Sequence, residues 1–261
     1  MTFQFFALTD TGRIRDNNED AVTFDEVAGV AVLADGMGGY NAGEVASHMA
    51  TTQIRDAMVQ WLQGEGADAG PVEINLAMQG IAHEANLSIF NAAQNNAKYF
   101  GMGTTLVMGV FKPDAAHIGH IGDSRCYRMR AGRLEQITRD HSLLQEQLDA
   151  GLVTPEQAMF SNIRNLVTRA VGVDAYTVLE VKDFAVEPGD LFLMCSDGLS
   201  DMVDIVGIAK IMATDEDIDT KATLLVNAAN AQGGRDNISV LLVEAPRGGS
   251  RWGVVSRLLG L

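Results

Sequence analysis

Short apolar runs bounded by turn-forming residues recur along the chain and have the length of strands rather than helices. They predict strands at residues 2–8, 27–34, 104–111, 115–121, 125–130, 134–138, 178–186, 191–196 and 238–243. Longer stretches of helical composition predict helices at 42–62, 72–98 and 219–231. A further helical segment at 141–158 is interrupted by Gly151 and Pro155.

The order of these elements predicts the class of fold. Strands are followed by two long helices, then by strands joined through tight turns, and then by helices and strands again. Strict alternation of strand and helix is absent, which argues against a doubly wound parallel sheet. Tight turns between consecutive strands favour antiparallel pairing, so we expect antiparallel sheets covered by helices.

Composition narrows the class of protein. The chain has 261 residues, 47% apolar and 20% charged, so we expect a globular protein rather than a disordered one. The net charge of −15 argues against a nucleic-acid surface. No apolar run approaches the ~18 residues of a membrane span, and the N-terminus lacks the pattern of a signal peptide. Cys126 and Cys195 form neither a disulfide framework nor a zinc pattern, which predicts a cytoplasmic protein.

Four carboxylates stand where strands are predicted to end or begin, namely Asp35, Asp123, Asp197 and Asp236. Two of them precede a glycine, which we expect to permit a sharp turn, so that the aspartate projects at the edge of the sheet. One such aspartate is usually only a turn residue. Four carboxylates brought together cannot share a small site unpaired, and an all-oxygen site suits a hard divalent cation. The sequence therefore predicts a site for Mg²⁺ or Mn²⁺.

The polar segment at 9–20, TDTGRIRDNNED, adds Arg13, Arg15, Glu19 and Asp20. It is either a solvated loop or part of the same site, where a guanidinium group would hold a phosphate through two hydrogen bonds. The five histidines, in contrast, show no metal-ligand spacing, and we interpret them as structural rather than as zinc ligands.

The segments that carry this chemistry occur in a fixed order: TDTGRIRDNNED, ADGMGGYNAGEVAS, GMGTTLV, IGDSRCYR, ITRDHSLLQEQLDAG, NLVTRAVG, CSDGLSD and GGRDNISVLLV. The ordered set closely resembles the motifs of the bacterial type-2C metal-dependent protein phosphatases, the PPM family, and covers residues 9–243. The resemblance implies an α+β fold, a four-layer αββα sandwich of two antiparallel sheets flanked by antiparallel helix pairs. It also implies hydrolysis of phosphoserine and phosphothreonine in proteins.

Matched motif by motif, the resemblance implies a set of metal ligands. Asp35 would bridge two Mn²⁺ or Mg²⁺ ions, and Gly36 would bind one of them through its backbone carbonyl. Asp197 and Asp236 would complete the pair. Asp123, with Asp197, would hold the third ion known in bacterial members of the family.

The same resemblance implies roles around the metals. Glu19 and Asp20 would hold metal-bound waters, and Arg15, rather than Arg13, falls on the phosphate-binding position. Residues 141–164 match the mobile flap beside the site. Physical chemistry agrees with this mechanism, because cations would lower the pKa of a bridging water, and the resulting hydroxide would attack phosphorus in line.

The chain departs from animal members of the family at Met37. They carry a histidine there that has been assigned as a general acid, whereas a thioether cannot donate a proton. We therefore expect metal-bound water to protonate the leaving group.

Other functions fit parts of the sequence. The glycine-rich GMGGYNAG could cradle a nucleotide, but it matches neither GxGxxG nor GxxxxGK[ST]. A pseudophosphatase, which binds phosphoproteins without turnover, would be distinguished by its failure to hydrolyse an aryl phosphate with metal. A cysteine phosphatase is excluded, because Cys126 lacks the CxxxxxR loop and Cys195 lies in an apolar strand.

The composition divides the chain into a catalytic domain at 1–245 and a basic, apolar tail at 246–261. The tail is either a disordered end or a helix docked on its own domain, or it contacts a partner protein or a membrane surface. The expected partners are phosphorylated proteins, and by analogy with bacterial relatives these include a Ser/Thr kinase or a forkhead-associated-domain protein.

Overall fold

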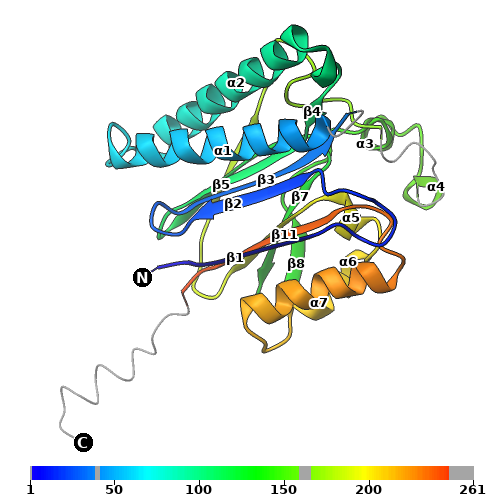
Figure 1. Ribbon diagram of the computed structural model, residues 1–261. Helices are drawn as coiled ribbons and strands as arrows, with labels where there is room; N and C mark the ends of the chain where they lie inside the picture. The colour runs from blue at the N-terminus through cyan, green and yellow to red at the C-terminus, as the bar shows by residue number, and fades with distance from the viewer. Residues whose placement is uncertain (1, 39–41, 159–165, 247–261) are drawn as a thin grey trace, which may run out of the picture.

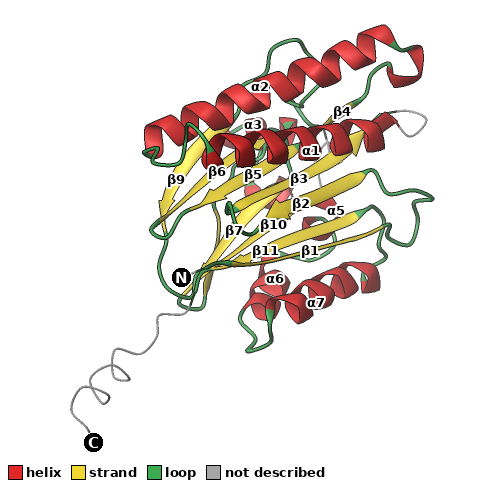
Figure 2. Cartoon of the chain, turned by 60° about the vertical axis from the view of Figure 1, so that its left-hand side comes forward, coloured by secondary structure: helices red, strands yellow, loops and turns green. Residues whose placement is uncertain are grey.

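Two antiparallel β-sheets face each other in the computed structural model, and each carries helices on its outer side (Figures 1 and 2). This arrangement confirms the predicted four-layer αββα sandwich. The structure describes residues 2–38, 42–158 and 166–246. The predicted tail, except for its first residue, and the last part of the predicted flap lie outside the described residues.

The first sheet is covered by α1 (Ala42–Gln63) and α2 (Pro71–Asn95), which is followed by the short 3₁₀ helix η1 (Ala97–Tyr99). Its strands run in the order β2 (Asp20–Asp25), β3 (Val30–Met37), β5 (Leu106–Phe111), β6 (Ala115–Ile121) and β9 (Glu180–Ala185), with β4 (Gly103–Thr104) paired to the end of β3. In β3, Val30 and Val32 pack against the helices, whereas Ala31 and Leu33 pack against the second sheet. Both faces of this strand are buried, which is why its sequence is a continuous apolar run.

The second sheet is covered by α5 (Asp197–Ser200), α6 (Ile205–Met212) and α7 (Ile218–Ala231). Its strands run in the order β1 (Gln4–Asp10), β11 (Ile238–Glu244), β10 (Leu191–Cys195), β7 (Arg125–Arg130) and β8 (Arg133–Gln136). Two short helices, α3 (Leu143–Asp149) and α4 (Pro155–Ala158), follow β8 within the predicted flap. Cys126 and Cys195 are both buried, and burial raises the pKa of each thiol.

The structure corrects three expectations. It contains β2 and α6, which the apolar pattern does not predict, since β2 is only half buried and α6 is a single short helix capped by Asp204. The predicted strand at 27–34 begins later, because Val27 is 93% exposed in a turn that ends at Gly29. The predicted turn after Asp35 is wrong, because β3 continues through Gly36 to Met37.

Candidate active site

The carboxylates at the predicted strand ends lie together at one end of the two sheets. Asp20 and Asp35 are paired across β2 and β3, and Asp123 follows β6, so these three come from the first sheet. Asp197 follows β10 and Asp236 precedes β11 in the second sheet. The other four all act electrostatically on Asp35. The structure thus brings together the four predicted aspartates and Asp20.

The two glycines that follow aspartates are required by close packing rather than by a turn. A Cβ atom on Gly36 would lie 2.2 Å from the carbonyl oxygen of Gly43 in α1. A Cβ atom on Gly198 would lie 1.9 Å from the carbonyl oxygen of Asn237. Neither glycine has a positive φ. Their missing side chains therefore let α1 and the residues before β11 approach the carboxylates closely.

The charge of this cluster is poorly compensated within the described residues. Burial, followed by repulsion from neighbouring carboxylates, raises the pKa of Asp35 and of Asp197 well above the usual range. Burial also raises the pKa of Asp20 and of Asp123 to about 6. Ser196 donates to Oδ2 of Asp20 at 2.8 Å, but the buried Oδ1 has no hydrogen-bond partner among the described residues. A crowded, buried, all-oxygen cluster with an orphaned oxygen fits hard divalent cations.

Arg15 lies at the edge of this cluster. Its guanidinium donates to Asp236 at 2.7 Å, and its side chain remains 51% exposed. The side chain of Arg15 therefore reaches both the carboxylates and solvent. Arg13 is also exposed, but its only described hydrogen bond joins its backbone N–H to the carbonyl of Gly234.

Asn237, which sequence reasoning missed, fastens the 9–20 segment to the second sheet. Its side chain donates to the carbonyls of Thr11 and Asn17 at 3.0 and 2.8 Å and accepts the N–H of Glu19 at 2.8 Å. The carbonyl of Glu19 in turn accepts the N–H of Gly36. Glu19 is half-buried, and burial raises its pKa. The only sequence signal for this role is the Asp-Asn pair directly before β11.

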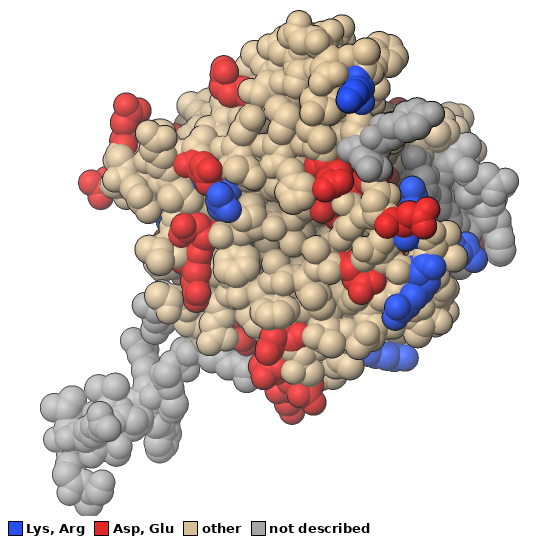
Figure 3. Space-filling model, in the orientation of Figure 1, with Lys and Arg blue, Asp and Glu red and all other residues tan. Residues whose placement is uncertain are grey.

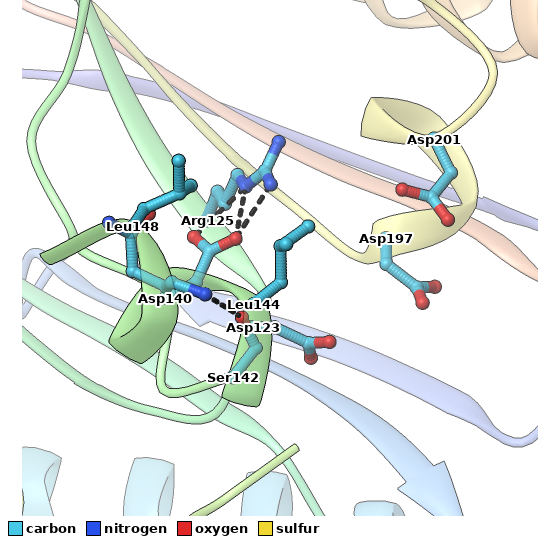
Figure 4. Close-up of a pocket in the computed structure, with 9 residues that line it drawn as sticks. Asp123, Arg125, Asp140, Ser142, Leu144, Leu148, Asp197 and Asp201 are labelled. Carbon is cyan, nitrogen blue, oxygen red and sulfur yellow. Dashed lines mark hydrogen bonds and ion pairs between the residues drawn. The ribbon is translucent and has the colours of Figure 1, made fainter. Parts of the chain in front are cut away.

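Asp140, directly before the predicted flap, and His141, its first residue, hold the turn that carries Asp123. The N–H of Gly122 donates to Nδ1 of His141 at 3.2 Å, and the N–H of His141 donates back to the carbonyl of Gly122 at 2.9 Å. Asp140 accepts hydrogen bonds of 2.6 to 3.0 Å from the guanidinium of Arg125 (Figure 4). The chain is therefore held both before Asp123, at Gly122, and after it, at Arg125.

A cavity of about 90 Å³ lies beside this turn. The carboxylates of Asp123, Asp197 and Asp201 line it together with the Arg125–Asp140 ion pair (Figure 4). Asp201, one turn of helix after Asp197, is a second residue of the site that the motifs did not single out.

Three side chains near the flap, those of His120, His141 and Glu180, place possible ligand atoms within 4.8 Å of one another. Nδ1 of His141 accepts a hydrogen bond from Gly122, so the neutral ring carries its proton on Nε2, which faces Glu180 at 3.4 Å. The His120 ring stacks on that of His141 at 4.5 Å and bonds to the carbonyl of Arg139. Burial lowers the pKa of both histidines. These contacts favour the structural interpretation of the two residues.

The remaining charge is spread widely. On the face seen in Figure 3, acidic side chains lie in several separate groups. This distribution agrees with a contribution of net charge to solubility. Among the described residues, none of the helices combines the length and the hydropathy of a membrane span.

Comparison with known proteins decides the family. Residues 13–242 match the family model described as protein phosphatase 2C. The chain belongs to the protein phosphatase 2C family. It is 38% identical over 241 residues to the serine/threonine phosphatase stp of Listeria innocua, which covers 90% of this chain and 93% of that protein. The predicted family and enzyme class, a protein-serine/threonine phosphatase, are thereby confirmed.

Solved structures agree with the fold. The Mycobacterium tuberculosis serine/threonine phosphatase PstP/Ppp superimposes with a TM-score of 0.84 and 32% identity, covering 95% of this chain and all of that chain. A second structure, the PstP catalytic domain in complex with two manganese ions, has a TM-score of 0.82 and 31% identity and covers 94% of this chain and 99% of that one. This protein is therefore a metal-dependent phosphatase of the family.

Proposed function

We propose that this phosphatase hydrolyses phosphoserine and phosphothreonine in proteins at the carboxylate cluster between its sheets. Asp35, Asp197, Asp236 and the carbonyl of Gly36 would hold two divalent cations. The observation that carries the proposal is the meeting of buried carboxylates from both sheets beside an exposed arginine. Bound cations would compensate the charge of such a cluster at neutral pH.

The neighbouring carboxylates have supporting roles in this proposal. Asp123 and Asp197 would hold a third ion, which agrees with their position around one cavity. Glu19 and Asp20 would orient waters of the metal site. Asp20 suits this role because one of its buried oxygens has no described partner.

In this proposal Arg15 binds the phosphate, whereas the two cysteines and Met37 have no part in the chemistry. When bound, the cations would supply positive charge for the phosphoryl oxygens and acidity to the attacking water. Arg15 would donate to a phosphoryl oxygen with its exposed guanidinium and so orient the phosphate. Cys126 and Cys195 are buried with raised pKa, so neither thiol is the nucleophile. Met37 cannot protonate the leaving group, and the proposed donor of that proton is a water of the metal site.

The wider role is proposed from the composition and the family. Residues 1–245 would form the catalytic domain, and residues 246–261 would contact a partner protein or a membrane surface. The substrates would include a bacterial Ser/Thr kinase or a forkhead-associated-domain protein in the cytoplasm. Mn²⁺ and Mg²⁺ are both compatible with an all-oxygen site.

One experiment separates catalysis from binding alone. The purified protein is stripped of metal with a chelator and assayed on an aryl phosphate and on a phosphothreonine peptide, with Mn²⁺ or Mg²⁺ added back in steps. We expect no turnover without metal and full turnover of both substrates with it. Peptide binding without turnover at any metal concentration would instead show a pseudophosphatase.

A further inference from the structure

A groove of about 620 Å³ opens beside the last residue of β3. Its walls include Met37, Val173, Tyr176 and Val178, together with Arg169. Three of these apolar side chains are well exposed, Val173 at 50%, Tyr176 at 72% and Val178 at 47%. Exposed apolar side chains gathered in one hollow are typical of a binding surface.

The wall of this groove is firmly attached to the fold. Asn86 of α2, which is fully buried, accepts the N–H of Gly172 at 2.7 Å and donates to the carbonyl of Asp174 at 2.9 Å. The ring of Tyr176 packs edge-on against His83 of α2 at 5.9 Å. The exposed side chains therefore project from a backbone that α2 holds in place, so binding a ligand there needs little ordering of this wall.

The position of the groove relative to the active site follows from strand pairing. Gly36 pairs with Thr104, and Thr104 pairs in turn with Val171. Neighbouring strands are roughly 4.8 Å apart, so Val171, which stands in the chain between the groove residues Ala170 and Val173, lies roughly 10 Å from Gly36. A Cβ atom on Gly103 would touch both Val173 and Met37, which shows that the two side chains flank the same residue. The groove is thus continuous with the strand that carries Asp35.

The groove carries one charged residue of each sign among its lining residues. Arg169 is the basic residue among its lining residues, and it forms no ion pair within the described part of the chain. Asp174 lines the groove as well and is its acidic residue. A guanidinium in this position is well placed for a carboxylate of a bound peptide.

We propose that this groove holds the substrate protein's own chain on one side of the phosphorylated residue. An extended peptide advances about 3.3 Å per residue, so a span of about 10 Å corresponds to about three residues. The groove would then select an apolar side chain about three residues from the phosphoserine or phosphothreonine, with an acidic side chain next to it facing Arg169. This inference rests on the proposed function and adds a substrate preference to it.

The test uses phosphothreonine nonapeptides of glycine, serine and alanine in which one leucine is moved through every position. With the intact protein and Mn²⁺, kcat/KM should rise about 10-fold when leucine stands about three residues away on one side, the factor expected from burying one apolar side chain. Tyr176→Ser should abolish this gain. Arg169→Gln should keep it but abolish any gain from a neighbouring glutamate.

Controls separate this inference from the function on which it rests. Leu76→Ser removes a similarly exposed apolar side chain from α2 outside the groove, and Arg133→Gln removes an exposed arginine of β8; both should leave the peptide preference unchanged. Every variant should retain aryl-phosphate turnover. Equal kcat/KM for all leucine positions, or an equal loss on peptide and aryl phosphate in Tyr176→Ser, would overturn the inference. Absence of aryl-phosphate turnover in the unaltered protein would contradict the proposed function instead.

Discussion

The sequences Asp35-Gly36 and Asp197-Gly198 have the same design, an apolar strand followed by aspartate and glycine, but the structure uses them differently. In the first sheet β3 continues through Asp35 to Met37 and pairs there with β4. In the second sheet β10 stops at Cys195, and Asp197 is the first residue of α5. Both carboxylates nevertheless reach the same cluster.

The two Asp-Gly pairs share one feature, which is the absence of a side chain on the residue after each aspartate. At both positions a Cβ atom would collide with a backbone carbonyl of another segment, that of Gly43 in α1 in one case and that of Asn237, directly before β11, in the other. What the two Asp-Gly pairs have in common is therefore the close approach of another backbone segment to the glycine. The local backbone conformation is free to differ.

The largest effect should come from removing either carboxylate. Asp35→Asn and Asp197→Asn keep the shape of the side chain and remove its charge. Residues that only contact the metal ligands typically contribute 10- to 100-fold to activity, so loss of a ligand charge should lower kcat further, by roughly 1,000-fold or more. Calorimetric titration should show weaker Mn²⁺ binding. Asp204→Asn is the matched control, because asparagine also caps a helix such as α6. Near-normal turnover of either variant at saturating Mn²⁺ would show that the two ends are not equivalent in function.

The two sheets also differ in their contact with Arg15, which forms an ion pair with Asp236 on the side of the second sheet. If it also orients phosphate, Arg15→Ala should lower kcat/KM by roughly 10- to 100-fold, as expected for loss of a charged hydrogen bond. Lysine should restore only part of the activity, because it lacks the planar fork. Arg13→Ala serves as the control in steady-state kinetics. Unchanged constants in Arg15→Ala would limit this arginine to a structural role.

Stability measurements test the packing explanation for the two glycines. Gly36→Ala and Gly198→Ala should each lower the free energy of unfolding by about 1–3 kcal/mol or more, because a rigid backbone must move. Gly80→Ala in α2 is the control, since its Cβ would meet nothing within 4 Å. That change should stabilise the helix by about 0.5–1 kcal/mol. Urea unfolding gives all three values, and a loss at only one of the two ends would break the comparison.

The smallest effect concerns pH. The pKa of Asp20 and of Asp123 is about 6 in the fold against an ordinary value of 3.8. A raised carboxyl pKa stabilises the fold fully below the ordinary value, and this stability is lost as pH rises through the folded value. The metal-free protein should therefore melt at a lower temperature at about pH 7.5 than at about pH 5.

Added Mn²⁺ should reverse this trend, because it binds the ionised carboxylates and so raises Tm most at the higher pH. Scanning calorimetry with and without a chelator measures both effects. A metal-free Tm that rises with pH over this range would contradict the crowding of uncompensated carboxylates.

Several parts of the site were predictable because they depend on local sequence. Apolar runs that lead into aspartate pointed to Asp35, Asp123 and Asp197 before any contact was known, although β3 continues for two residues beyond Asp35. The order of the motifs predicted the family and the four layers. The start of the strand predicted at 27–34 was placed too early, because Val27 is a residue type common in strands but lies exposed in a turn.

The remaining features depend on contacts between residues far apart in the chain. Asn237 fastens a segment more than 200 residues away in the chain. His141 accepts a hydrogen bond from Gly122, and nothing in the sequence around His141 indicates this contact. The sequence by itself determined which residue types could bind metal and phosphate. Only the tertiary structure decided that Gly36 and Gly198 serve close packing, because a steric collision exists only once α1 and the residues before β11 are in place.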